Sequence, residues 1–281
     1  MNNFTQATVN DNVDSSVSND APHLIVIGGT SGLGLALALH HQQLGWQVSV
    51  VGHNETKIAK LNLQHPTIRT YRCDLTDLIQ RQNLMTELSN VRFERLIYSA
   101  GSYTNERVHN LNQADSEQML AINLQAFQEV FSWASRQLKS QALEGDKPLA
   151  HADKLSLLCI ASIAGTLDYP YASLYAKSKR AMIATSSAYR TALAPFNIQV
   201  TCIAPGYIDT QTLRDLNNGD ASHKPFIISI DKAVSHIMQA IDNNVELTVF
   251  PRPMRYIVRA LNCVPKPWLN KLLTSKLDKK A

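Results

Sequence analysis

The chain has 281 residues, of which 44% are hydrophobic and 18% charged, and its formal net charge is +4. This length suits one α/β domain, and the low charge content is typical of a sheet that is buried on both faces. No apolar run reaches about 18 residues, so a transmembrane helix is not expected. The excess positive charge is concentrated between residues 252 and 281, which argues against a nucleic-acid-binding protein.

Residues 1–22 are rich in Asn, Asp, Ser and Thr and contain neither Lys nor Arg. A secretory signal needs a basic start and an apolar run, and this segment has neither. We expect a disordered N-terminal tail over 1–22, a Rossmann-type domain over 23–250 and a basic amphipathic C-terminal extension over 251–281. The four cysteines show no metal-type spacing, so we expect no metal site and a reducing, cytoplasmic location.

Strand and helix patterns alternate along the domain. Apolar runs predict strands at 24–27, 47–51, 68–73, 95–99, 155–160, 198–203 and 246–250. Amphipathic stretches predict helices at 35–44, 54–63, 76–88, 114–138, 172–193 and 231–241. This order predicts a single α/β domain with a doubly wound parallel sheet in three α/β/α layers, the Rossmann fold. Ligands of such sheets bind beyond the C-terminal ends of the strands.

A glycine-rich segment, Gly28-x-x-x-Gly32-x-Gly34, follows the first strand and opens the first helix. Glycine permits a tight turn and lets a pyrophosphate approach the free amides of the helix N-terminus. An isolated glycine-rich turn would carry little meaning. At the first strand-to-helix junction of an α/β domain, it predicts a dinucleotide site.

Tyr175 and Lys179 are four residues apart on a predicted helix, so both side chains lie on one helix face. A free tyrosine has a pKa near about 10, and a neighbouring cation favours the phenolate. We therefore expect Lys179 to lower the pKa of Tyr175 and to make it a general acid/base. Ser162, thirteen residues upstream, follows a predicted strand and faces the same edge of the sheet.

The combined pattern resembles the short-chain dehydrogenase/reductase family, in its single-domain branch, over about residues 23–250. The matching positions keep the order and spacing of that family: Gly28, Gly32, Gly34, Asn123, Ser162, Tyr175, Lys179, Pro205 and Gly206.

The resemblance implies a catalytic role for four residues. Tyr175 would be the general acid/base, and Lys179 would lower its pKa and hold the nicotinamide ribose. Ser162 would bind the substrate oxygen, and Asn123 would anchor a water chain that relays protons toward Lys179.

The resemblance also implies cofactor contacts. Asp74 would lie beside the adenine, although it is equally suited to cap the helix that follows strand three. The full set of expected cofactor contacts is Gly28, Thr30, Ser31, Gly32, Leu33, Gly34, His53, Asp74, Leu75, Ser99, Ala100, Gly101, Tyr175, Lys179, Pro205, Gly206, Ile208 and Thr210.

Two segments depart from the family pattern. The family usually has Asn-Asn-Ala-Gly after strand four, and this chain has Tyr98-Ser99-Ala100-Gly101. Because the two small residues are kept, we expect a local repacking without loss of cofactor binding. The usual Ser-Ser pair is Ala161-Ser162 here, and the retained serine has the catalytic spacing.

The end of strand two bears on the choice of cofactor. An acidic residue there would bind the ribose 2′-hydroxyl of NAD and repel the phosphate of NADP. This chain reads Val51-Gly52-His53-Asn54, without an acid, and Thr30 and Ser31 can donate to a phosphate. We expect NADP(H), with NAD possible in principle because a histidine is only partly charged at neutral pH.

We expect Ser162, Tyr169 and Tyr207 to contact a small-molecule carbonyl or alcohol, with the polar segment 211–228 forming a wall. The resemblance implies a homodimer or homotetramer through the helices at 114–138 and 172–193.

The C-terminal extension has an apolar face at Met254, Ile257, Val258 and Leu261, followed by Trp268 and several lysines. Such a helix packs on its own domain or a partner subunit, which we favour, or lies on an anionic membrane. The leading hypothesis is an NADP(H)-linked oxidoreductase acting on a carbonyl or secondary alcohol. Alternatives are a catalytically silent dinucleotide-binding sensor or scaffold, and a membrane-peripheral reductase of lipid-like ketones.

Overall fold

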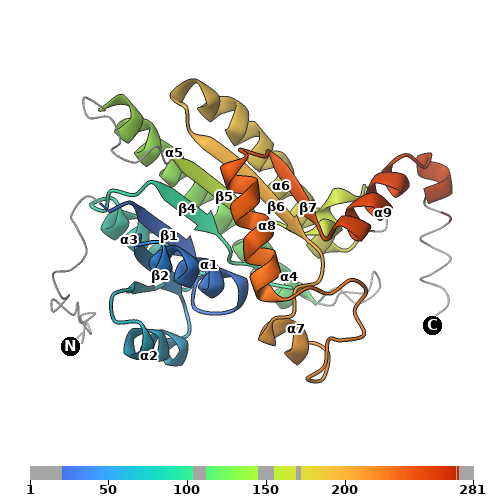
Figure 1. The fold of residues 1–281 in the computed structure, drawn as a ribbon, viewed down its shortest axis with the longest axis horizontal. Helices are drawn as coiled ribbons and strands as arrows, with labels where there is room; N and C mark the ends of the chain where they lie inside the picture. The colour runs from blue at the N-terminus through green and yellow to red at the C-terminus, as the bar shows by residue number, and fades with distance from the viewer. Residues whose placement is uncertain (1–20, 104–111, 145–154, 169–171, 270, 272–281) are drawn as a thin grey trace.

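The computed structural model describes residues 21–103, 112–144, 155–168, 172–269 and 271. It contains one seven-stranded sheet in the order β3-β2-β1-β4-β5-β6-β7, with every neighbouring pair parallel (Figure 1). The strands are β1 His23–Ile27, β2 Gln47–Gly52, β3 Arg69–Arg72, β4 Arg95–Tyr98, β5 Ser156–Ile160, β6 Gln199–Pro205 and β7 Leu247–Phe250. The predicted doubly wound sheet is confirmed. Of the expected tail at 1–22, residues 1–20 lie outside the described residues.

The helices fill the crossovers between strands. They are α1 Gly32–Gln43, α2 Glu55–Gln64, α3 Leu78–Leu88, α4 Gln113–Leu120, α5 Phe127–Leu143, α6 Leu174–Leu193, α7 Gln211–Asp215, α8 Ile230–Asp242 and α9 Arg252–Asn262. Six of them begin at a polar residue whose side chain accepts a hydrogen bond from the first turn, an arrangement that contributes about 1 kcal/mol per helix. These N-cap residues are Asn54, Asp77, Asn112, Ser173, Thr210 and Ser229.

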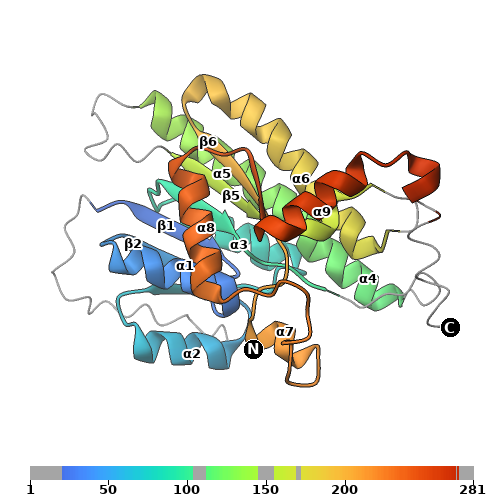
Figure 2. The ribbon, with the colours of Figure 1, turned by 45° about the vertical axis from the view of Figure 1, so that its right-hand side comes forward.

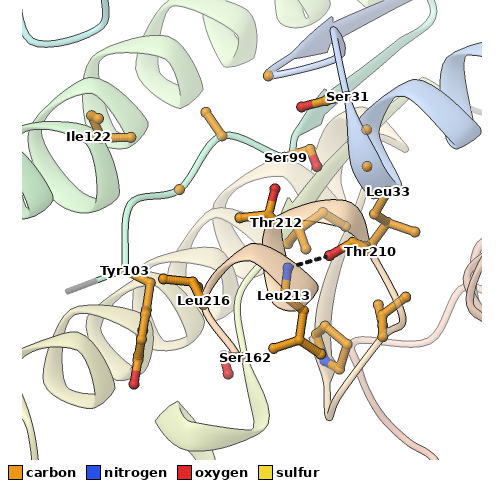
Figure 3. A pocket seen from close by; sticks show the side chains of 18 of the residues that line it. Ser31, Leu33, Ser99, Tyr103, Ile122, Ser162, Thr210, Thr212, Leu213 and Leu216 are labelled. Atoms are coloured by element: carbon orange, nitrogen blue, oxygen red, sulfur yellow. Dashed lines mark hydrogen bonds between the residues drawn. The ribbon is translucent and has the colours of Figure 1, made fainter. Parts of the chain in front are cut away.

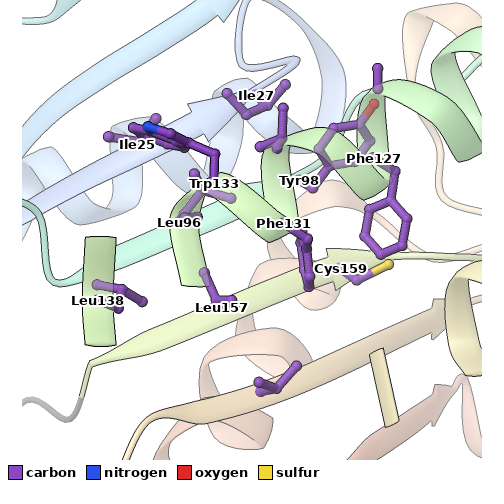
Figure 4. Close-up of a cluster of buried hydrophobic side chains, with 14 of the residues drawn as sticks. Ile25, Ile27, Leu96, Tyr98, Phe127, Phe131, Trp133, Leu138, Leu157 and Cys159 are labelled. Carbon is purple, nitrogen blue, oxygen red and sulfur yellow. The ribbon is translucent and has the colours of Figure 1, made fainter. Parts of the chain in front are cut away.

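Alternate residues of each strand supply two hydrophobic cores, one on each face of the sheet. Leu24 and Val26 of β1 pack with α1, α2 and α8. Ile25 and Ile27 point to the opposite face, where α3, α5 and α6 cover the sheet (Figure 4). Because both faces are buried, the C-terminal edge of the sheet is the place where polar side chains of the strand ends come together.

One predicted helix is interrupted. The segment expected as a single helix at 114–138 consists of α4, a π-helical turn η1 at Ala121–Ala126, and α5. The hydroxyl of buried Tyr98 donates a 2.6 Å hydrogen bond to the carbonyl oxygen of Ile122, inside this turn. The wider turn is therefore tied to the sheet, and it carries Asn123 toward the C-terminal edge.

The C-terminal part of the chain contains the short helix α7 and the helix α9. Helix α7 lies in the segment 211–228, which we expected to form a polar wall. The C-terminal helix α9 leads away from the end of β7 in both ribbon views (Figures 1 and 2). None of its residues, all of them within the described part of the chain, is buried. Met254, Val258 and Leu261 on its apolar face are half-buried, and packing of this helix on a partner subunit stays a prediction.

Candidate active site

A cavity of about 810 Å³ lies at the C-terminal ends of the strands. Ser31 and Leu33 after β1, Ser99 after β4, Ser162 after β5 and Thr210 after β6 surround it (Figure 3). Of the expected site residues, those that line the cavity are Gly28, Thr30, Ser31, Gly32, Leu33, Gly34, His53, Asp74, Leu75, Ser99, Ala100, Gly101, Ser162, Tyr175, Pro205, Gly206, Tyr207, Ile208 and Thr210. Asn123 and Lys179 do not line it, but a Cβ built on the lining residue Gly101 would lie 3.5 Å from Oδ1 of Asn123 and 3.1 Å from Nζ of Lys179. Tyr169 is outside the described residues.

The glycine loop requires glycine for space as well as for conformation. Gly28 has φ of 82°, and a Cβ built there would lie 2.6 Å from the backbone N and Cα of Ala100. A Cβ on Gly34 would clash with the carbonyl oxygen of Gly28. Ser31, the N-cap of α1, makes no side-chain bond to the first turn, so the first amides of this helix remain available. Close approach and free amides are what a pyrophosphate needs.

The corner beyond β2 carries positive charge that the sequence reasoning missed. Lys57, in the first turn of α2, lines the cavity beside His53 and Asn54. Its Nζ donates a 3.4 Å hydrogen bond to the Oγ of Ser31. The sequence could have indicated Lys57, because Asn54 is a recognisable N-cap residue that follows β2. The first turn of α2, which contains Lys57, therefore lies at the same edge of the sheet.

Asp74 does not cap the helix after β3. Its Oδ1 accepts hydrogen bonds from the backbone N–H and the hydroxyl of Thr76, while Asp77 is the N-cap of α3. The adjoining carbonyl oxygen of Leu75 accepts a 2.8 Å hydrogen bond from buried Arg81. Asp74 and Leu75 of this turn line the cavity, and the adenine contact of Asp74 stays a prediction.

The segment after β4 joins a buried aromatic residue to the small residues of the cavity. Tyr98 is fully buried in the core, its ring packed edge-on against Phe127. Ser99, Ala100 and Gly101 then line the cavity. A Cβ on Gly101 would lie 3.1 Å from the Nζ of Lys179, so the small residue makes room for that side chain.

Asn123 is completely buried and joins two parts of the site. Its Oδ1 accepts a 3.0 Å hydrogen bond from the N–H of Ser102, and its Nδ2 donates to the Ser102 carbonyl oxygen at 2.9 Å. The same Nδ2 donates to the Oγ of Ser178, the neighbour of Lys179, at 3.1 Å. Asn123 therefore fixes the chain after β4 against α6.

The three residues singled out for chemistry come together on β5 and α6. Ser162 and Tyr175 line the cavity, and their hydroxyl groups interact. The Nζ of Lys179 lies 5.9 Å from the centre of the Tyr175 ring and donates a 3.2 Å hydrogen bond to the carbonyl oxygen of Ile160. The Oγ of Ser162 also accepts from the N–H of Ala164 at 3.2 Å, which orients this hydroxyl.

The electrostatics of this group differ from the sequence-based prediction. Burial raises the pKa of Tyr175, and its contact with Ser162 lowers the pKa by a smaller amount. Burial also lowers the pKa of Lys179 to about 8. The net shift of the Tyr175 pKa is therefore opposite to the predicted lowering, because burial outweighs the effects that favour the phenolate. At neutral pH Tyr175 holds its proton and Lys179 remains charged, which suits a proton donor.

The open end of the cavity has an aromatic and aliphatic wall. Tyr103 packs edge-on against Tyr175, with ring centres 4.9 Å apart. Leu213 and Leu216, from α7 and its C-cap, and Met254 of α9 complete this wall (Figure 3). Leu213 and Leu216 lie in the segment 211–228 that we expected to form a wall, whereas Tyr103 and Met254 were not predicted. Met254 could not be placed from the sequence, because the packing of α9 on Gly206 depends on tertiary contacts.

Within the ranges that the structure describes, no group of three or more His, Cys, Asp or Glu side chains could hold a metal ion. The same residues include no helix long and apolar enough to cross a bilayer. Cys73, Cys159 and Cys202 are buried free thiols, as expected for core residues, and Cys263 is exposed.

Comparison with known proteins gives one consistent result. Residues 22–221 match the family described as short chain dehydrogenase. The chain is similar to the 3-oxoacyl-[acyl-carrier-protein] reductase FabG of Chlamydia trachomatis, with 27% identity over 69% of this chain and 77% of the relative. It is 24% identical to the NADPH-dependent 1-acyldihydroxyacetone phosphate reductase of Schizosaccharomyces pombe, over 68% of this chain and 62% of the relative.

Solved structures share the fold. A short-chain dehydrogenase from Sphingobium yanoikuyae in complex with NADPH superimposes with a TM-score of 0.72 and 18% identity, covering 86% of this chain and 92% of its own. The bulky-bulky ketone specific alcohol dehydrogenase from Comamonas testosteroni gives 0.70 and 17%, covering 93% and 95%. At this identity the likeness concerns the fold alone.

Proposed function

This chain belongs to the short-chain dehydrogenase/reductase family of oxidoreductases, and on that premise we propose that it is an NADP(H)-linked reductase of carbonyl compounds. The observation that carries the proposal is that Ser162 and Tyr175 line the same cavity as the glycine loop. A dinucleotide site and a proton donor thus share one space. The bound cofactor would donate a hydride to the substrate carbon in reduction and accept one from the alcohol in oxidation.

The residues of the chain would bind the substrate oxygen and transfer the proton. Ser162 would hold the substrate oxygen, because its Oγ lies beside the Tyr175 hydroxyl and is oriented by Ala164. Tyr175 would give its proton to that oxygen in reduction and take it back in oxidation. Lys179 would stabilise the phenolate that remains and hold the ribose, while Asn123 would keep α6 in place for proton relay.

The proposed preference for NADP(H) is supported by the positive charge near the end of β2. The two residues directly after β2, His53 and Asn54, are not acidic, and Lys57 together with Ser31 offers an ammonium and a hydroxyl at this corner. An additional phosphate would be attracted to Lys57 and would accept hydrogen bonds from both groups. His53 lines the same corner.

The proposed substrate class is a ketone that carries an acyl chain. Both named relatives reduce acyl ketones by their names, and the wall formed by Tyr103, Leu213, Leu216 and Met254 is apolar. Such a wall binds alkyl groups through burial of their surface. The homodimer or homotetramer and the cytoplasmic location stay predictions.

The test is NADPH oxidation with a series of 3-oxoacyl thioesters and aliphatic ketones of increasing chain length. We expect turnover that improves with chain length and that is weaker with NADH. Tight NADPH binding without turnover of any carbonyl would favour the alternative of a silent sensor or scaffold and would contradict the proposal.

A further inference from the structure

The helix α9 presents an uncovered face that is basic and aromatic. Arg252, Arg255 and Arg259 recur at intervals of three and four residues, so they share one side of the helix. All three are exposed, and none of them contacts a carboxylate in the described ranges 21–103, 112–144, 155–168, 172–269 and 271. Tyr256, which is 64% exposed, lies between them on the same side.

Apolar side chains border this basic face. Ile257 of α9 is 48% exposed, and Trp268, shortly after the helix, is 75% exposed. The chain has three tryptophans, and the other two, Trp46 and Trp133, are buried in the domain. Exposed tryptophan and tyrosine beside arginine are typical of a surface that meets lipid headgroups.

The segment is held in place on the domain, so that its free face has a fixed direction. Leu269 is buried, and the Nζ of Lys266 lies 3.2 Å from a carboxylate oxygen of Asp168. The Nδ2 of Asn262 donates a 3.1 Å hydrogen bond to the carbonyl oxygen of Thr166, in the loop that follows Ser162. At the other end of the helix, Met254 lines the mouth of the cavity.

We propose that α9 and the segment up to Trp268 form a docking surface for an anionic lipid bilayer. The sequence from Leu247 to Lys271 contains five basic residues and no acidic one, so the charge of this surface complements that of anionic headgroups. A second copy of the chain fits less well, because an isologous contact would place the arginines of one copy against those of the other. The exposed Ile257 and Trp268 favour a bilayer over a purely ionic partner. The proposal concerns binding and does not depend on the proposed reaction.

Trp268 supplies a direct optical test. When vesicles of equimolar phosphatidylcholine and phosphatidylglycerol are added to the full-length protein, tryptophan emission should shift to shorter wavelength as Trp268 enters the interface. Trp268→Phe should abolish the shift, because Trp46 and Trp133 are already buried. A shift that persists in Trp268→Phe, or no shift in the unmodified protein, would overturn the proposal.

Cosedimentation with the same vesicles tests how much the positive charge of α9 contributes to binding. Each arginine near an anionic surface contributes about a fivefold increase in affinity, so Arg252→Gln/Arg255→Gln/Arg259→Gln should bind on the order of a hundredfold more weakly. The matched control, Lys60→Gln/Arg69→Gln/Arg136→Gln, removes the same charge from exposed positions elsewhere and should bind like the unmodified protein. Binding should also be weak with phosphatidylcholine alone and at high salt.

Two results would overturn the inference. Equal loss of binding in both triple variants would mean that overall charge, not α9, attracts the protein. If the unmodified protein does not bind vesicles and the α9 triple variant changes its oligomeric state in sedimentation velocity, the face is a contact between copies of the chain.

Discussion

The ammonium nitrogen of Lys179 lies 5.9 Å from the centre of the Tyr175 ring, and burial lowers the pKa of this lysine to about 8. The lysine is therefore charged at neutral pH but loses its proton at moderately alkaline pH. Since burial raises the pKa of Tyr175, the phenol keeps its proton over the same range. The pair is arranged for proton donation, which is the step that carbonyl reduction needs.

Carbonyl reduction should therefore slow in alkaline solution. Below pH 8 the charged Lys179 stabilises the phenolate that forms when Tyr175 gives up its proton, and this help is lost as the pH rises through about 8. The turnover number with NADPH and a ketone, measured between about pH 6 and pH 10, should fall above about pH 8. A rate that stays constant up to about pH 10 would contradict this assignment.

Lys57→Gln should weaken NADPH binding selectively. Loss of a charged hydrogen bond to a phosphate lowers the affinity by roughly tenfold or more, whereas NADH lacks this phosphate. Fluorescence titration of both cofactors would measure the effect. Lys60→Gln, on the same helix but away from the cavity, is the matched control. Equal weakening of NADPH and NADH would exclude Lys57 as the residue that recognises the phosphate.

Gly28→Ala should lower the stability of the protein and its affinity for NADPH far more than Gly45→Ala. The two glycines have φ of 82° and 83°, so alanine is strained by about 1 kcal/mol at either position. A Cβ on Gly28 meets the Ala100 backbone at 2.6 Å, whereas a Cβ on Gly45 meets nothing within 4 Å. Urea denaturation with NADPH titration should show a larger loss of stability and of affinity for Gly28→Ala. Similar results for both variants would contradict the close approach of the two loops.

Acid should destabilise the protein through His41. Its Nδ1 lies 2.8 Å from the Leu37 carbonyl oxygen, and its Nε2 lies 2.8 Å from Nη1 of Arg95, so the ring is held neutral. Burial, followed by the charge of Arg95, lowers its pKa from 6.5 to about 3. The unfolded state therefore binds one more proton below pH 6.5, and stability is lost as the pH falls. The loss attributable to His41 by about pH 5 is on the order of 2 kcal/mol.

The free energy of unfolding, measured between about pH 7 and pH 5, tests this expectation. His41→Asn should be less stable at neutral pH, because the contact with Arg95 is altered, but its stability should fall less steeply with acid. Parallel curves for the two proteins would show that His41 does not titrate on unfolding.

The sequence alone was sufficient to predict the features that depend on local residue patterns. Apolar runs and the glycine spacing predicted the order of strands and helices, and the strand ends then place Ser162 and Tyr175 at one edge of the sheet. The i,i+4 spacing likewise placed Lys179 close to Tyr175. Periodicity carries this information because it reports which face of each element is buried.

The sequence alone was insufficient to predict the features that depend on tertiary contacts. The π-helical turn at Ala121–Ala126 is tied to Tyr98 and Ser102, which are distant in sequence from it. The direction of the Tyr175 pKa shift was predicted wrongly because spacing shows the neighbouring cation but not the extent of burial. Met254 reaches the cavity only through the way α9 is set against the sheet.

The most direct test of the account is the turnover of Tyr175→Phe with NADPH and a ketone. Removal of the proton donor should lower the turnover number by on the order of a hundredfold or more, while NADPH binds as before. Tyr103→Phe removes a hydroxyl from the same wall of the cavity and should keep most of the turnover. If Tyr175→Phe retains more than a few per cent of the activity (about 5%), Tyr175 is not the general acid/base.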